Sequence, residues 1–200
     1  MQRLSRAIVT TDPPLSLDVY ASVPSAFDVR TVLNLSAGDI DVSRPASWVE
    51  RIVARPYVKD YDAVPGNHPT DWSDLLGSAR SVQLGAHVGR ERVGGAVLLH
   101  DGPEVELLEG RRELALLWDI RVAASHQGRG IGRALFAAAV SWAQARGCRE
   151  VRVETQDVNV PACRFYARQG CRLDVVRPQA YAQFPEETQL LWRLGPIPSS

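Results

Sequence analysis

Between residues 116 and 142 the pattern of apolar positions changes its period, and this change predicts a strand followed by a helix. Over residues 116–123 apolar side chains recur at every second position, which is typical of a β-strand. From residue 131 onward they follow one stripe of a helix, through Leu135 to Trp142. Three glycines at alternate positions separate the two periods. The sequence therefore predicts a strand, a glycine-rich loop and a helix, in that order.

The rest of the chain alternates between short strand patterns and helix patterns. Predicted strands cover residues 29–35, 82–89, 93–99, 149–157, 171–177 and 187–194. Predicted helices cover residues 71–80, 131–146 and 159–169, with a further helix start at 41–52 that Ser43 would cap. Residues 56–72 and 101–112 are expected as loops. Gly94 and Gly95 inside a strand indicate a bulge, or a backbone left bare for a neighbour. Strands interleaved with helices indicate an α/β fold with a sheet of mixed direction.

Length and composition are those of a globular protein with one domain. The chain has 200 residues and a mass of 22.0 kDa. We expect a single domain over residues 1–200, with 1–14 as an arm or edge strand and 195–200 as a loose tail. Basic and acidic residues both number 23, and a chain without a basic excess is not expected to bind nucleic acid generally.

Localisation and redox state follow from features that the sequence lacks. Its apolar runs are too short to span a membrane, and its first residues lack a secretory pattern. The three cysteines have neither metal nor disulfide spacing, and the four histidines show no ligand pairing. We therefore expect a cytoplasmic protein with reduced thiols, no metal site and no membrane partner.

The loop Gln127–Arg133 has the composition of an anion-binding helix start. Glycine tolerates positive φ and close approach, and a helix N-terminus offers unpaired N–H groups to an anion. The P-loop pattern is absent, and the Rossmann pattern fails in both frames, although Glu154 lies where a ribose-binding carboxylate would be expected. The pattern that matches is Gln/Arg-x-x-Gly-x-Gly/Ala, at Gln127, Gly130 and Gly132. A glycine-rich helix start with no ligand is the alternative.

Two segments together resemble the GNAT superfamily of N-acetyltransferases. The first is the loop at Gln127, which is similar to the acetyl-CoA pyrophosphate loop of that superfamily. The second is an Asn followed by a helix that carries Phe-Tyr and ends at Gly, seen here from Asn159 to Gly170. The strings VETQDVNVPACRFYARQGC, YAQFP and LLW resemble, more narrowly, the streptothricin acetyltransferases. The resemblance covers residues 93–194, whereas the first 80 residues match no pattern.

The resemblance implies a fold and a cofactor. It implies the GNAT (acyl-CoA N-acyltransferase) fold, a mixed but mostly antiparallel sheet that is splayed at the acetyl-CoA site and flanked by helices, with residues 82–194 as its core. Strand backbone would hold the pantetheine arm, loop amides the pyrophosphate, and arginines in the loop would add charge, unless they are solvated surface residues. The implied cofactor-binding residues are Ile120, Val122, Gln127, Gly128, Arg129, Gly130, Ile131, Gly132, Arg133, Asn159 and Tyr166.

Tyr166 is the candidate catalytic acid. The resemblance implies that its hydroxyl protonates the coenzyme A thiolate as it leaves, and a phenol suits this role because its pKa lies above that of a thiol. The alternative is a buried aromatic residue beside Phe165. The general base is open between Glu154 and Asp119, with Asp157 as a third choice. Glu154 and Asp119 could each instead be a strand charge paired with an arginine two residues away.

The function expected from the resemblance is acetyl transfer from acetyl-CoA, by direct attack, to a primary amine of a small polycationic molecule such as a streptothricin-like antibiotic. Protein N-termini, lysines and polyamines are alternative acceptors, and a non-catalytic acyl-CoA-binding module is the alternative of a different class. The resemblance also allows a homodimer.

Overall fold

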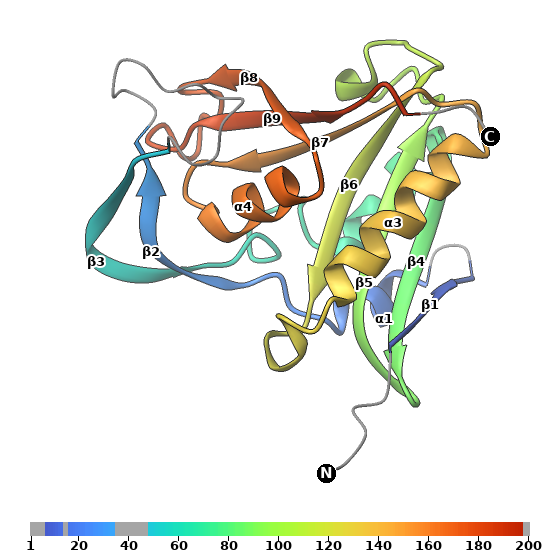
Figure 1. Ribbon diagram of the computed structural model, residues 1–200, viewed down its shortest axis with the longest axis horizontal. Helices are drawn as coiled ribbons and strands as arrows, with labels where there is room; N and C mark the ends of the chain where they lie inside the picture. The colour runs from blue at the N-terminus through green and yellow to red at the C-terminus, as the bar shows by residue number, and fades with distance from the viewer. Residues whose placement is uncertain (1–6, 14–15, 35–47, 198–200) are drawn as a thin grey trace. The chain divides into compact units, whose positions relative to one another are not determined.

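The computed structural model describes residues 7–13, 16–34 and 48–197 (Figure 1). The chain forms two compact units, which we describe separately. The first unit contains residues 1–26, 60–151 and 197–200, and the second contains residues 27–59 and 152–196. The chain passes from the first unit into the second after Ala26 and again within strand β7 (Glu150–Gln156).

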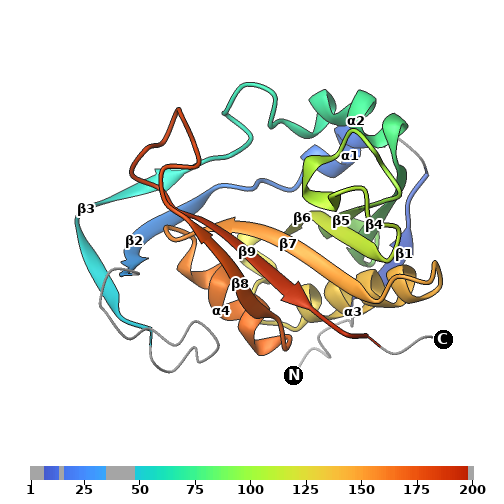
Figure 2. The ribbon, with the colours of Figure 1, turned by 90° about the horizontal axis from the view of Figure 1, so that it is seen from above.

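An antiparallel sheet with helices on both faces forms the first unit. Its strands are β1 (Ile8–Thr11), β4 (Arg80–Val88), β5 (Glu91–His100) and β6 (Leu114–Val122), in the order β1-β4-β5-β6. Figure 2 shows α3 (Ile131–Gln144) on one face and α1 (Leu17–Ala21) and α2 (Ser73–Ser78) on the other. The 3₁₀ helices Pro69–Trp72, Glu106–Leu108 and Ala124–His126 lie in its connections. The edge strand expected within residues 1–14 is thus confirmed at β1.

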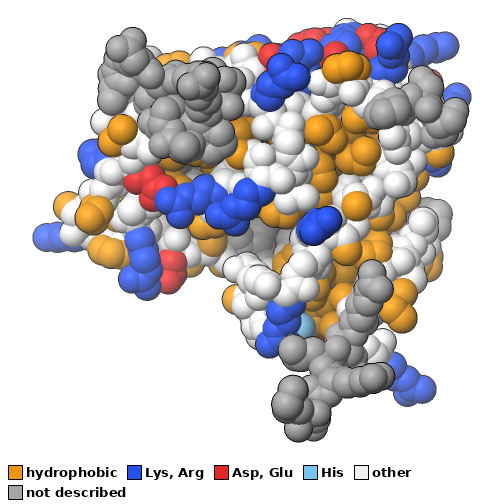
Figure 3. Space-filling view, viewed as in Figure 1, with side chains coloured by type: hydrophobic (Ala, Val, Ile, Leu, Met, Phe, Trp, Pro, Cys, Tyr) orange, Lys and Arg blue, Asp and Glu red, His pale blue; other side chains and the backbone are white. Residues whose placement is uncertain are grey.

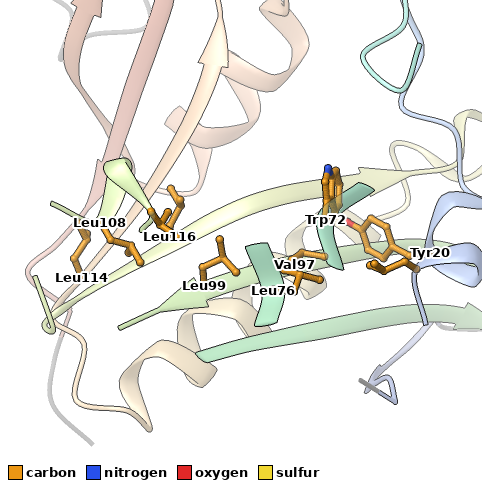
Figure 4. Packing of buried hydrophobic residues seen from close by; sticks show 10 residues of the cluster. Tyr20, Trp72, Leu76, Val97, Leu99, Leu108, Leu114 and Leu116 are labelled. Atoms are coloured by element: carbon orange, nitrogen blue, oxygen red, sulfur yellow. The ribbon is translucent and has the colours of Figure 1, made fainter. Parts of the chain in front are cut away.

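The core on the α1–α2 side of this sheet is formed by aromatic and aliphatic side chains (Figure 4). Helix α1 contributes Tyr20, and the 3₁₀ helix Pro69–Trp72 with α2 contributes Trp72 and Leu76. The sheet contributes alternate residues of β5 and β6, such as Leu99 and Leu116. The ring centroids of Tyr20 and Trp72 lie 6.0 Å apart. Because alternate strand residues face opposite sides, the period-two pattern of β6 places one set of its apolar side chains here.

The glycines inside β5 confirm the expectation of a bulge and of a bare backbone. The register with β4 shifts between Ala86 and His87, next to Gly94. A Cβ on Gly94 would lie 2.8 Å from the carbonyl oxygen of Arg121, and one on Gly95 would lie 2.5 Å from the ring of Tyr20. Both glycines are therefore required by close neighbours, one on each face of the strand.

Replacing Gly95 with alanine is expected to destabilise the protein by about 1–3 kcal/mol, because the Tyr20 ring and the β4 backbone would have to move. Gly77→Ala is the matched control, since a Cβ there meets nothing within 4 Å in helix α2. Alanine at position 77 should stabilise the protein by about 0.5–1 kcal/mol. Urea unfolding midpoints measure both changes, and equal midpoints for the two variants would contradict the packing argument.

The second unit contains a two-stranded sheet and a separate group of strands with one helix. β2 (Phe27–Leu33) pairs antiparallel with β3 (Glu50–Lys59). β7 is followed by α4 (Val160–Arg168), β8 (Arg172–Arg177) and β9 (Gln189–Leu194), and the strand order is β7-β9-β8. β8 and β9 are antiparallel. Together the two units confirm the expected α/β class with mostly antiparallel strands flanked by helices.

Several expectations for residues 27–80 are wrong or only partly covered. The strand predicted at 29–35 exists as β2, which covers Phe27–Leu33. The helix expected at 41–52 lies outside the described residues up to residue 47, and Ile52 belongs to strand β3 instead. The loop expected from Pro56 begins only after Lys59. By contrast, the helix expected at 71–80 is confirmed by α2 and the preceding 3₁₀ turn.

The geometry of β3 explains how a strand can contain Pro56, which favours a loop in the sequence. Tyr57 pairs with Val29, and Ile52 pairs with Thr31, with a register irregularity between them. Pro56 lies in the intervening unpaired stretch, where a missing N–H removes no ladder hydrogen bond. The tail expected to be loose is also fixed at Ile197, which is buried and whose N–H donates to the Arg149 carbonyl at 2.8 Å.

Candidate active site

The glycine loop of the first unit is confirmed as the connection between β6 and α3. Gly128 and Gly130 have φ values of +74° and +81°, and Gly130 is the residue before the first turn of α3. These are left-handed conformations that side chains with a Cβ rarely adopt. The Gln127 side chain braces the loop, since its Nε2 donates to the carbonyl of Val122 at 3.1 Å. The loop is thus folded locally, by backbone conformations that its sequence specifies.

This loop leaves space and charge for an anion. A Cβ built on Gly128 or Gly130 would meet nothing within 4 Å, so both glycines border open space. Arg129 and Arg133 are exposed, whereas Ile131 is buried and offers only its backbone. Basic side chains, all of them arginines, lie at the surface over the loop that precedes α3 (Figure 3). Backbone amides, the helix dipole and two arginines therefore combine at one helix start.

The strand before the loop brings the other candidate cofactor residues of the first unit into line. Ile120 and Val122 pair with Ala96 and Gly94 of β5. The register between the strands shifts beside Trp118, because Asp119 pairs with Val97 whereas Leu117 pairs with Leu98. Trp118 is therefore the extra residue of a β-bulge, which turns the following residues of β6.

Asp119 belongs to a buried ionic network. Arg121 Nε and Nη2 donate to its two oxygens at 2.8 and 3.2 Å, and the Tyr20 hydroxyl donates to Oδ2 at 2.5 Å. The same guanidinium donates to both oxygens of Asp62 at 2.8 and 3.1 Å, and to the carbonyl of Val23 at 3.0 Å. All five N–H groups of Arg121 thus have acceptors. The sequence-based alternative, a strand charge paired with Arg121, describes this geometry.

Burial and charge shift the titration of this network. The Tyr20 pKa is raised well above its ordinary value, first by burial and then by the charge of Asp119. Burial lowers the pKa of Arg121, but the carboxylates and its hydrogen bonds outweigh burial and raise it overall. Arg121 therefore stays charged and the Tyr20 hydroxyl keeps its proton in the physiological range, and the hydrogen bonds of the network hold residues 20–23, 62 and 119–121 together.

Glu154 in the second unit has a different environment. It receives a hydrogen bond from the Tyr181 hydroxyl at 2.7 Å on one oxygen and from Gln189 Nε2 at 2.8 Å on the other. Gln156 Nε2 donates in turn to the Tyr181 oxygen at 3.0 Å. The pKa of Tyr181 is raised, first by burial and then by the charge of Glu154. The two side chains that donate to the Glu154 carboxylate here are therefore neutral.

Helix α4 carries Asn159 and Tyr166 as expected. The Asn159 side chain caps the helix, with its oxygen accepting from the Ala162 N–H at 3.2 Å. Tyr166 is 5% exposed, and its ring lies 5.4 Å from that of Phe165 and 6.3 Å from that of Trp192. The packing expected of a buried aromatic residue is present, and it fixes the ring.

The predicted residues divide between the two units. Asp119 and the candidates from Ile120 to Arg133 follow one another in the first unit, and Glu154, Asn159 and Tyr166 belong to the second. Sequence reasoning missed Tyr181 as a partner of Glu154, although it lies in the YAQFP string. It also missed Asp62 and Tyr20 as partners of the Arg121–Asp119 pair, since no local pattern marks them.

Two kinds of site are not found among the residues that the structure describes. No group of three or more His, Cys, Asp or Glu side chains there could hold a metal ion. Nor is any helix in that part of the chain long and apolar enough to cross a membrane.

Known acetyltransferases are similar to this chain in sequence. The model of the acetyltransferase (GNAT) family matches residues 49–171. The streptothricin acetyltransferase of Escherichia coli is 32% identical over 140 residues, which are 68% of this chain and 70% of that protein. Streptothricin acetyltransferase A of Bacillus subtilis is 36% identical over 80 residues, which are 39% of this chain and 46% of that protein.

Solved structures show the same fold. A nourseothricin acetyltransferase matches with a TM-score of 0.71 at 22% identity, covering 96% of this chain and 99% of the other. A protein described as a putative streptothricin acetyltransferase from Bacillus anthracis, in complex with acetyl coenzyme A, matches with a TM-score of 0.73 at 20% identity, covering 95% and 99% of the two chains. At these identities the likeness establishes the fold.

Proposed function

Because the chain belongs to the acetyltransferase (GNAT) family, we propose that it transfers an acetyl group from acetyl-CoA to a primary amine of a polycationic, streptothricin-like antibiotic. The observation that carries the proposal is the loop Gln127–Arg133, where two left-handed glycines and a helix N-terminus border open space beside two arginines. The names of the curated relatives support the antibiotic as acceptor.

In the proposed complex, the chain holds acetyl-CoA mainly through backbone groups. Loop amides, Arg129 and Arg133 bind the pyrophosphate, and the backbone of Ile120 and Val122 binds the pantetheine arm. The solved relative with acetyl coenzyme A supports this cofactor. Asn159, already the cap of α4, contributes an amide to the same cofactor.

The proposed reaction is direct attack of the amine on the thioester carbonyl. The acceptor arrives as an ammonium ion, so a carboxylate must remove a proton before the nitrogen attacks. Glu154 is the first candidate for this base and Asp119 the second. As the tetrahedral intermediate collapses, the C–S bond breaks and Tyr166 donates its phenolic proton to the coenzyme A sulfur. The nitrogen loses its remaining excess proton as the amide forms, and proton uptake restores the phenol. No acetyl-enzyme forms in this scheme.

The organisation of the protein is part of the same proposal. We propose one catalytic domain over residues 1–200, since the family match from 49 to 171 includes parts of both units. A cytoplasmic location and a homodimer complete the proposal. Light scattering during gel filtration measures the assembly.

The experiment that tests the function is a screen of amines with acetyl-CoA, in which the release of free coenzyme A thiol is measured. Streptothricin is expected to give steady thiol release and a product heavier by one acetyl group per modified amine. Acetyl-CoA binding without turnover on any amine would instead favour the acyl-CoA-binding module. Turnover on peptides with free N-termini or lysines, and not on streptothricin, would move the acceptor to proteins.

Replacing both Arg129 and Arg133 with glutamine is expected to raise the KM for acetyl-CoA by roughly five- to twentyfold. The variant would lack the two exposed positive charges that attract the pyrophosphate in the proposed complex. The kcat should change little, since neither side chain approaches the thioester in the proposed complex. Arg146→Gln is the control, as this arginine follows the other end of α3 and stacks on Trp142 at 3.9 Å. An unchanged KM in the double variant would remove both arginines from the phosphate site.

A further inference from the structure

The connection between β8 and β9 contains two turns that carry Tyr181, Phe184 and Glu187. The Phe184 N–H donates to the Tyr181 carbonyl at 3.1 Å, and the Glu187 N–H donates to the Phe184 carbonyl at 3.0 Å. These are two consecutive turns that share Phe184. The side chains of Phe184 and Glu187 both contact Lys59, and the charge of Glu187 helps to raise the pKa of Tyr181, so the three side chains lie near one another.

Those three side chains meet charged groups from two other elements of the second unit. Tyr181 donates to Glu154 of β7 at 2.7 Å. Lys59 at the end of β3 lies over the Phe184 ring, with Nζ 3.2 Å from its centroid, and donates to Glu187 Oε1 at 2.5 Å. The two turns thus connect the candidate base Glu154 with a buried ion pair.

Glu187 has a carboxylate oxygen that this ion pair does not use. The side chain is 2% exposed, and Oε2 has no hydrogen-bond partner among the residues that the structure describes. A buried carboxylate oxygen without a partner is costly, and such groups often mark a place where a ligand binds. An ionised carboxylate oxygen can only accept hydrogen bonds, so the group that would satisfy Oε2 is a donor.

The surroundings of Glu187 favour a cation. Asp157 is buried, and its Oδ1 accepts from the N–H of Thr188, the residue that follows Glu187, at 2.9 Å. Burial, and then the charges of Glu186 and Asp157, raise the pKa of Glu187, although Lys59 opposes them. The half-exposed Tyr57 is close enough that Glu187, Glu186 and Asp157 raise the pKa of its phenol after burial does. Glu186, Glu187 and Asp157 therefore concentrate negative charge around the second turn.

An organic ammonium fits this cluster better than a metal ion. The described carboxylates do not converge as metal ligands would. An ammonium group has up to three donors and needs only one or two oxygens, and an aromatic face such as Phe184 already accommodates the ammonium of Lys59.

We propose that Glu187 Oε2, with Asp157 nearby, binds an ammonium group of the acceptor that is not acetylated, and so selects polycations over monoamines. Tyr181 links this position to Glu154, where the reacting amine would lose its proton. The identity of the acceptor rests on the function proposed above, whereas the ammonium site itself does not.

A calorimetric titration without acetyl-CoA tests the site with a matched pair of probes, 1,5-diaminopentane and 1-aminopentane. The wild-type protein is expected to bind the diamine at least tenfold more tightly than the monoamine. In the double variant Lys59→Met, Glu187→Gln, the ratio of the two dissociation constants should fall to about one. The double variant leaves no unpaired buried charge at this pair, and circular dichroism checks that it is folded.

Lys59→Met alone distinguishes a binding role from a purely structural ion pair. It frees Glu187, so the preference for the diamine should persist or increase. Loss of that preference in Lys59→Met, or its persistence in the double variant, overturns the site.

Turnover assays keep the two proposals separate. Equal binding of both probes by a wild-type protein that acetylates streptothricin would contradict the ammonium site and leave the proposed function intact. A tenfold preference for the diamine in a protein that turns over no amine would contradict the proposed function and leave the ammonium site intact.

Discussion

Replacing Tyr166 with phenylalanine is expected to lower kcat by about 10²–10⁴-fold, because the coenzyme A thiolate would leave without a proton donor. The phenylalanine ring keeps the packing against Phe165 and Trp192, so the thermal stability should change little. The KM for acetyl-CoA should also stay within a few-fold of the wild-type value. Initial rates and a thermal melt measure these three quantities.

The leaving group provides the sharper control for Tyr166. An acetyl thioester of an aromatic thiol with a low pKa expels its thiolate without protonation, so the variant should lose much less rate on it than on acetyl-CoA. An equal loss on both donors would mean that the hydroxyl does not act as the acid. In that case Tyr166 would be the buried aromatic residue of the alternative interpretation.

The loop and its flanking elements could be predicted because their signals are local. The change of period around residue 123 depends on neighbouring side chains, and left-handed turns at Gly128 and Gly130 depend on the absence of a Cβ. The cap at Asn159 is equally local, since its oxygen accepts from an N–H three residues away. Sequence reasoning succeeds where one short segment contains the whole cause.

Strand β3 could not be predicted because its cause lies elsewhere in the chain. Pro56 and the polar residues around it resemble a loop, and only pairing with β2 extends this segment to ten residues. The strand tolerates the proline because the bulge opposite residues 29–31 leaves that stretch unpaired. Tertiary pairing overrides the local preference here.

The choice of base was open in the sequence for the same reason. Glu154 and Asp119 both alternate with arginine along a strand, so their patterns are equivalent. Their partners differ only through distant residues, since Tyr20 reaches Asp119 and Tyr181 reaches Glu154. The fold therefore separates two carboxylates that no sequence pattern could rank.

Replacing Glu154 with glutamine is expected to lower kcat by at least a hundredfold, and Asp119→Asn by much less. A proton on Asp119 would break its ion pair with Arg121, which holds both of its oxygens. A proton on Glu154 breaks no ion pair with its two hydrogen-bond partners named above, because Tyr181 and Gln189 are neutral donors. Asp119→Asn should instead reduce stability by about 1–3 kcal/mol, because it weakens a buried charged network.

The pH dependence of kcat decides between the two carboxylates. Loss of a general base removes the rise of the rate with pH that its ionisation produces, so this rise should disappear in Glu154→Gln and persist in Asp119→Asn. Each variant is compared at a temperature where its melt shows it folded, since Asp119→Asn loses rate by unfolding as well. A folded Asp119→Asn variant with the larger loss and no such rise would assign the base to Asp119, and the Tyr181–Glu154 pair would then serve only to hold β7 and the turns before β9.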